Sequence, residues 1–146
     1  MKKRVSVPLL TIVTLILGLL VTSNISGEER KDNKKDSQIV TLSAQNYNAE
    51  TAKGLVLVDF WAVWCGPCRK MNPVLEDISK EMKDVVKIGK LNIDNYKKLA
   101  IDKQVQSIPT IIVYKDGKEI DRITGVVAKE DLKKAIKIYS TANLAN

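Results

Sequence analysis

Residues 55–68 read LVLVDFWAVWCGPC, an apolar run that leads directly into a Cys-Gly-Pro-Cys motif. The run from Leu55 to Trp61 is apolar on both faces apart from one acid, which is typical of a central strand covered on both sides. Apolar residues at helical spacing from Pro67 to Met82 predict a helix immediately afterwards. Cys65 and Cys68 therefore lie where a strand turns into a helix.

These two residues are the chain's only cysteines. A disulfide between them would close a small ring, which removes little entropy from the unfolded chain and stabilises the fold little. A bond that is made and broken fits the spacing better. Free N–H groups and the macrodipole at a helix start favour a thiolate and lower the pKa of the first cysteine. The pattern predicts Cys65 as the nucleophile and Cys68, one turn further along, as the resolving thiol.

Two other interpretations of the cysteine pair are a zinc site and a static disulfide that fastens the turn. Zinc ordinarily takes four Cys or His ligands, or three and a water molecule, and the chain has no histidine and no further cysteine. We expect neither a metal nor a cofactor. The static disulfide stays open as the less favoured alternative.

The N-terminal segment differs in character from the rest of the chain. The basic start Met1–Arg4 precedes the nearly continuous apolar run Val5–Val21, a pattern typical of an export signal. As a helix this run would span about 25 Å, short of a ~30 Å hydrocarbon core, so cleavage is favoured over a lasting membrane anchor through residues 5–21. The predicted organisation is a signal peptide or signal anchor (1–23), a polar linker (24–37), one domain (38–142) and a short tail (143–146).

The charge balance does not indicate a nucleic-acid partner. The chain carries a net charge of +7, of which residues 1–36 contribute +3, leaving +4 for the remainder. Its lysines are spread among acids along helical stretches, which is typical of a solvated surface. With one Phe, four Tyr and two Trp, no basic stripe with interleaved aromatic residues is present to stack on bases.

The remaining sequence alternates strand and helix patterns. Strands are expected at 39–42, 55–61, 85–93, 110–114 and 119–124, and helices at about 43–53, 67–82, 96–105 and 128–139. Asp116-Gly117 between the last two strands predicts a hairpin. In the third helix, Leu99 and Ile101 are expected to face inward. The order βαβαβαββα predicts an α/β sandwich, with helices on both faces of a mixed sheet.

The segment Val58–Cys68 resembles the active-site segment of the thioredoxin family. Lys90–Asp94, Ser107–Thr110 and Lys115–Gly117 resemble later motifs of that family, in the same order. The resemblance covers residues 38–142. It implies the thioredoxin fold, a redox-active disulfide between Cys65 and Cys68, and a role in electron transport and redox homeostasis through thiol-disulfide exchange.

The acid in the expected strand 55–61, Asp59, is a candidate for proton transfer, since burial disfavours the charged form of a carboxylate. A half-exposed acid on an edge strand is the alternative. The resemblance places the matching carboxylate beneath the second cysteine and implies Lys90 as its charged partner. It also implies a cis peptide bond at Pro109. The implied active-site turn consists of Gly66, as a permissive glycine, and Pro67. The implied substrate groove consists of Trp61, Trp64, Ile108, Pro109, Thr110 and Gly125.

The residues between the cysteines favour one direction of electron flow. Cys-Gly-Pro-Cys resembles the reducing members of the family, whereas oxidising members often carry histidine there. We therefore expect a protein-disulfide reductase, working as a monomer outside the cytoplasm, in a periplasm or on the outer face of the cytoplasmic membrane. Its expected partners are disulfide-containing exported proteins and a membrane electron donor. An extracytoplasmic oxidase or isomerase, or a redox-inert binding module, stays open.

Overall fold

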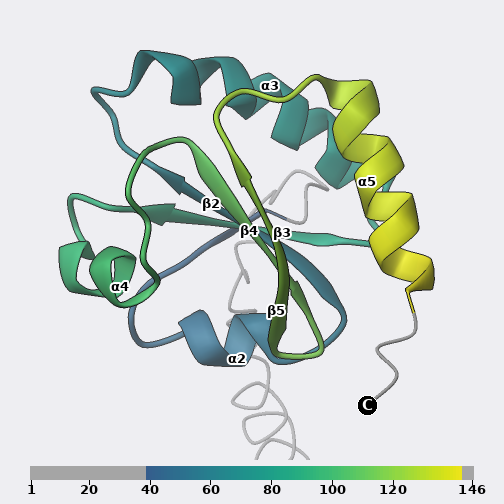
Figure 1. Ribbon diagram of the computed structural model, residues 1–146, viewed down its shortest axis with the longest axis horizontal. Helices are drawn as coiled ribbons and strands as arrows, with labels where there is room; N and C mark the ends of the chain where they lie inside the picture. The colour runs from purple at the N-terminus through teal and green to yellow at the C-terminus, as the bar shows by residue number, and fades with distance from the viewer. Residues whose placement is uncertain (1–38, 143–146) are drawn as a thin grey trace, which may run out of the picture. The chain divides into compact units, whose positions relative to one another are not determined.

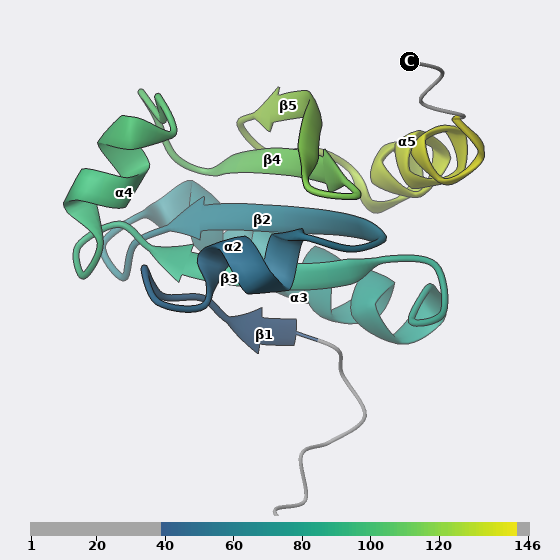
Figure 2. The same cartoon turned by 90° about the horizontal axis from the view of Figure 1, so that it is seen from below.

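A mixed five-stranded sheet forms the centre of the computed structural model, which describes residues 39–142. The strands lie in the order β1-β3-β2-β4-β5, as Figure 2 shows. Parallel pairing joins β3 to β1 and β2, whereas β4 pairs antiparallel with β2 and β5. The bounds are β1 (Ile39–Thr41), β2 (Leu55–Trp61), β3 (Lys87–Asn92), β4 (Thr110–Lys115) and β5 (Lys118–Thr124).

Helices cover both faces of this sheet. The four described helices are α2 (Tyr47–Thr51), α3 (Gly66–Glu81), α4 (Lys97–Asp102) and α5 (Lys129–Thr141). One core cluster joins α3 and α5 to one face, and a second joins α2 and α4 to the other (Figure 1). The predicted element order and the α/β architecture are confirmed.

Strand β2 determines which residues lie beneath the helix that follows the cysteine motif. Successive side chains of a strand point to opposite faces. Leu55 and Leu57 belong to the cluster that contains Met71 and Leu75 of α3. By the same alternation Asp59 points to the α3 face, at the end of the sheet where α3 begins.

The third predicted helix is shorter than expected, and the prediction for Ile101 was wrong. α4 ends at Asp102, and Gln104 two residues later has a φ of 55°, in the left-handed region where a helix cannot continue. Ile101 is 72% exposed, whereas Ala100 is buried. Residues two apart on a helix point in nearly opposite directions, so Leu99 and Ile101 could not both face the sheet.

The predicted signal segment, linker and tail lie outside the described residues. Between residues 39 and 142, no helix has both the length and the hydropathy to cross a membrane.

Candidate active site

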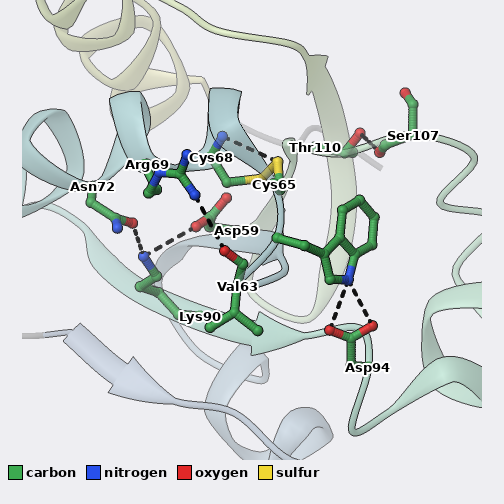
Figure 3. Close-up of a disulfide and its surroundings, with 11 residues drawn as sticks. Asp59, Val63, Cys65, Cys68, Arg69, Asn72, Lys90, Asp94, Ser107 and Thr110 are labelled. Carbon is green, nitrogen blue, oxygen red and sulfur yellow. Dashed lines mark hydrogen bonds and ion pairs between the residues drawn. A yellow bond between two sulfur atoms is a disulfide. The ribbon is translucent and has the colours of Figure 1, made fainter.

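Cys65 and Cys68 form a disulfide with an Sγ–Sγ distance of 2.07 Å and a Cα–Cα distance of 5.3 Å. Cys65 is the N-cap of α3, in an extended conformation, and its Sγ accepts a hydrogen bond from the Cys68 backbone N–H at 3.1 Å (Figure 3). Pro67 lies in the first turn of α3, where its missing N–H costs nothing. The motif thus places one sulfur against an N–H group that the helix leaves free.

Gly66 is the first residue of α3, and it does not need the special freedom of glycine. Its φ lies outside the left-handed region, and a Cβ there would meet only the end of the Arg69 side chain, at 3.8 Å. The resemblance implied that glycine positions of this kind either bring the backbone close to substrate or allow a permissive turn, and the turn at Gly66 does not require a glycine.

Asp59 is fully buried, so the alternative of a half-exposed edge position is wrong. Within the described part of the chain, neither of its carboxylate oxygens has a hydrogen-bond partner. The Lys90 Nζ lies 3.5 Å from Asp59 Oδ2, from the neighbouring position on β3. In Figure 3 the carboxylate lies between this ammonium and the disulfide.

Burial dominates the protonation of Asp59. Desolvation raises the pKa of this carboxyl from 3.8 to about 6, against the opposing effect of the Lys90 charge. A carboxyl with such a pKa exchanges its proton close to neutral pH. The arrangement can therefore accept a proton from a thiol and return it to solvent.

A hollow with a volume of about 320 Å³ lies near the disulfide, since two of its lining residues, Ile93 and Ile108, pack against the cluster that contains both cysteines. Trp64 forms one wall, with its side chain 65% exposed and its indole N–H donating to the Asp94 carboxylate at 3.0 and 3.2 Å. Ile108 also lines the hollow. The lining is Trp64, Ile93, Ala100, Val105, Gln106, Ser107 and Ile108.

The Ile108–Pro109 peptide bond is cis, as the resemblance implied. The Pro109 carbonyl accepts a hydrogen bond from the Gly125 N–H at 2.8 Å, so these two predicted groove residues are neighbours. Gly125 has a φ of 90°, which glycine adopts without strain. The described structure thus joins the loop before β4 to the end of β5 beside the site.

A thioredoxin family model matches residues 38–138. The chain belongs to the thioredoxin family. It is 47% identical over 102 residues to a thioredoxin of Chlamydia caviae, covering 70% of this chain and 99% of that protein. It is 44% identical over 98 residues to a thioredoxin of Bacillus subtilis, covering 67% and 94% respectively.

Solved structures agree with this assignment. The crystal structure of a Malassezia sympodialis thioredoxin superimposes with a TM-score of 0.63 at 30% identity, covering 72% of this chain and 93% of that one. The described residues thus have the thioredoxin fold. With a cysteine pair at disulfide distance, this thioredoxin-family protein is a thiol-disulfide oxidoreductase.

Of the six residues expected in the thioredoxin groove, Trp64 and Ile108 line this hollow, whereas Trp61, Pro109, Thr110 and Gly125 are not among its lining residues. Thr110 is buried, and its hydroxyl donates to the Ser107 carbonyl at 2.8 Å, so its side chain does not line the groove. Trp61 packs against the two cysteines but lines a second cavity of about 270 Å³ together with Lys90. Both positions alternate along strands, and the resemblance alone did not specify which face each presents.

Three residues of the site were not among the predicted site residues, although two of them, Ile93 and Asp94, lie within the quoted motif Lys90–Asp94. Asn72 accepts a hydrogen bond from Lys90 Nζ, and Asp94 holds Trp64 as described above. Ile93 extends the apolar wall of the hollow. The position of Ile93 and Asp94 directly after a strand was a usable signal, because loops at strand ends often carry function. For Asn72 no signal existed in the sequence.

Within residues 39–142, no group of three or more acidic, Cys or His side chains could hold a metal ion.

Proposed function

We propose that this thioredoxin-family protein is a protein-disulfide reductase that works outside the cytoplasmic membrane with its Cys-Gly-Pro-Cys dithiol. The position of Cys65 at the N-cap of α3 supports the proposal most directly. In the reduced protein the Cys68 N–H that now faces Cys65 Sγ would stabilise a thiolate there. Cys65 is therefore the proposed nucleophile.

The proposed reaction transfers two electrons from the dithiol to a substrate disulfide. The Cys65 thiolate attacks one substrate sulfur, so the substrate S–S bond breaks, a mixed disulfide forms, and the other substrate sulfur leaves and takes a proton. Cys68 then gives its proton to the Asp59 carboxylate and attacks Cys65 Sγ. The second substrate sulfur leaves, and the Cys65–Cys68 disulfide is formed. Asp59 finally passes its proton to the leaving thiolate or to solvent.

The hollow beside the disulfide is the proposed substrate groove. Its walls of Trp64 and Ile108 are apolar, and the loop from Ile108 to Pro109 offers backbone groups to an extended chain. We propose that a segment carrying the substrate cysteine lies along this loop, which brings its sulfur to Cys65.

The chemical proposal is tested with the full chain and a protein disulfide as substrate. We expect Cys65→Ser to lose reduction completely, and Cys68→Ser to react once and remain attached to the substrate. The reduction potential of the pair decides between the reductase and the oxidase or isomerase: a value close to those of reducing thioredoxins supports our proposal. A value close to that of a periplasmic oxidant would contradict it.

Residues 1–37 support the proposed location. They have no counterpart in the family match, which begins at residue 38, and they combine a basic start, an apolar run and a polar linker. Outside the cytoplasm the disulfide would persist, so a membrane protein that passes electrons across the bilayer is the proposed donor, and exported proteins are the proposed substrates.

The location is tested by measuring the mass of the mature protein from its native cell and its accessibility to added protease. A mass that lacks about 23 residues, or a full-length chain that protease reaches from outside, supports export. A full-length protein in the cytoplasmic fraction, protected from protease, would refute it.

A further inference from the structure

The Lys90 ammonium has three neighbours near the active-site disulfide. It donates a hydrogen bond to the Asn72 side-chain carbonyl, lies 3.5 Å from Asp59 Oδ2, and lies 5.1 Å from the centre of the Trp61 ring. Its side chain is only 18% exposed. These contacts hold the ammonium in one place, between α3 and the sheet (Figure 3).

Asn72 reaches this ammonium from the active-site helix. It lies four residues after Cys68, so the two side chains share one side of α3. Asp59 approaches from β2, below the same helix. Asn72 and Asp59 therefore offer oxygen atoms to one ammonium from two different elements.

The Lys90 ammonium interacts more closely with the Asn72 side-chain oxygen than with the Asp59 carboxylate. Asn72 Oδ1 accepts a hydrogen bond from the ammonium, whereas Asp59 Oδ2 forms an ion pair with it at 3.5 Å, too long for an ordinary hydrogen bond, and neither Asp59 oxygen accepts a hydrogen bond. A carboxylate that accepts a hydrogen bond from an ammonium is stabilised more than one that only feels its charge. Lys90 thus stabilises ionised Asp59 less than it would in direct contact.

We propose that Asn72 is a positioning residue that holds the Lys90 ammonium off Asp59 and so keeps this carboxylate free to exchange protons with Cys68. Asn72 touches neither the substrate nor the sulfur atoms in this role. It acts through Lys90, which acts on Asp59.

Among the groups that face Asp59, Lys90 has the largest effect on its protonation. From β3 the facing group is Lys90, from β4 the paired residue is the apolar Ile111, and α3 presents Cys68 and the neutral Asn72. Lys90 is the charge that acts on Asp59 in the described part of the chain. A small movement of this ammonium therefore changes the proton affinity of Asp59.

The direct test is titration of the Asp59 carboxyl carbon by NMR in the oxidised full chain, where the cysteines do not titrate. In Asn72→Ala the ammonium is released to Asp59, and we expect the midpoint to fall by about half a unit or more. In Asn72→Asp a second carboxylate holds the ammonium and repels Asp59, so the midpoint should rise. The same change at the exposed Asn48, Asn48→Ala, is the matched control and should leave it unchanged.

A double variant shows whether Asn72 acts through Lys90. Lys90→Ala should raise the midpoint, and Asn72→Ala added to it should produce no further shift. An unchanged or raised midpoint in Asn72→Ala, or a further shift without Lys90, would overturn the proposal. Thermal unfolding shows whether Asn72→Ala is folded. If it is not, Asn72→Asp gives the test with the opposite sign, and a lowered or unchanged Asp59 midpoint in that variant overturns the proposal.

The kinetic consequence rests on the proposed role of Asp59, and the titration does not. The pH profile of disulfide reduction should move with the midpoint in each variant. A midpoint that moves while the pH profile stays would uphold the positioning role and refute proton transfer by Asp59.

Discussion

Replacing Asp59 by asparagine should stabilise the protein at neutral pH while it slows the reaction. The wild-type carboxyl is fully buried and has a pKa raised to about 6, whereas in the unfolded chain it ionises near 3.8. Between these two values the folded state keeps a proton that the unfolded state has lost, so raising the pH through this window destabilises the wild-type fold.

The size of the effect follows from the shift. The two pKa values of Asp59 differ by about two units, and each unit corresponds to about 1.4 kcal/mol. The wild type should therefore lose about 3 kcal/mol of stability between roughly pH 4 and pH 7, and it should lose nothing further above that range. A side-chain amide does not titrate, so the Asp59→Asn variant should not show this loss.

Urea unfolding of both oxidised proteins at a series of pH values measures this difference. The free energy of unfolding of the variant minus that of the wild type should grow with pH through this window. The same change at the exposed Asp84 is the control and should give a difference that does not grow. In turnover, Asp59→Asn should accumulate mixed disulfide. A stability difference that stays constant from about pH 4 to pH 7 would refute the raised pKa of Asp59.

Three further predictions concern the cysteines, the core and the groove. Cys68→Ser should leave the Cys65 mixed disulfide with a substrate protein intact, which non-reducing electrophoresis and mass measurement detect; prompt release of substrate would contradict the resolving role. Gly89→Ala should cost about 1–3 kcal/mol in urea unfolding, because a Cβ there would come within 2.5 Å of the buried Leu42 side chain; an unchanged stability would show that Leu42 moves freely. Ile108→Asp should raise KM for protein disulfides with little change in kcat, and an unaltered KM would argue against the groove.

Local patterns predicted most of the architecture. The bounds of β2 agree with the apolar run Leu55–Trp61, and the Asp116-Gly117 turn does join β4 to β5. Such features depend on neighbours in the sequence, and turn residues and strand patterns act over a few positions. Predictions that depended on which side of an element faces the core were less secure, as Ile101 and Thr110 show.

The sequence by itself determined that a cysteine pair stands at a strand-helix junction within an alternating α/β order, because both depend on local spacing. Only the tertiary structure decided that Asp59 is buried without a hydrogen bond, since an acid within an apolar run carries no sign of what covers it. Asn72 and Lys90 are eighteen residues apart in the sequence, and they are in contact only because α3 packs across β3. Proton affinity at this site is thus a property of packing, whereas the position of the sulfur atoms is a property of the motif.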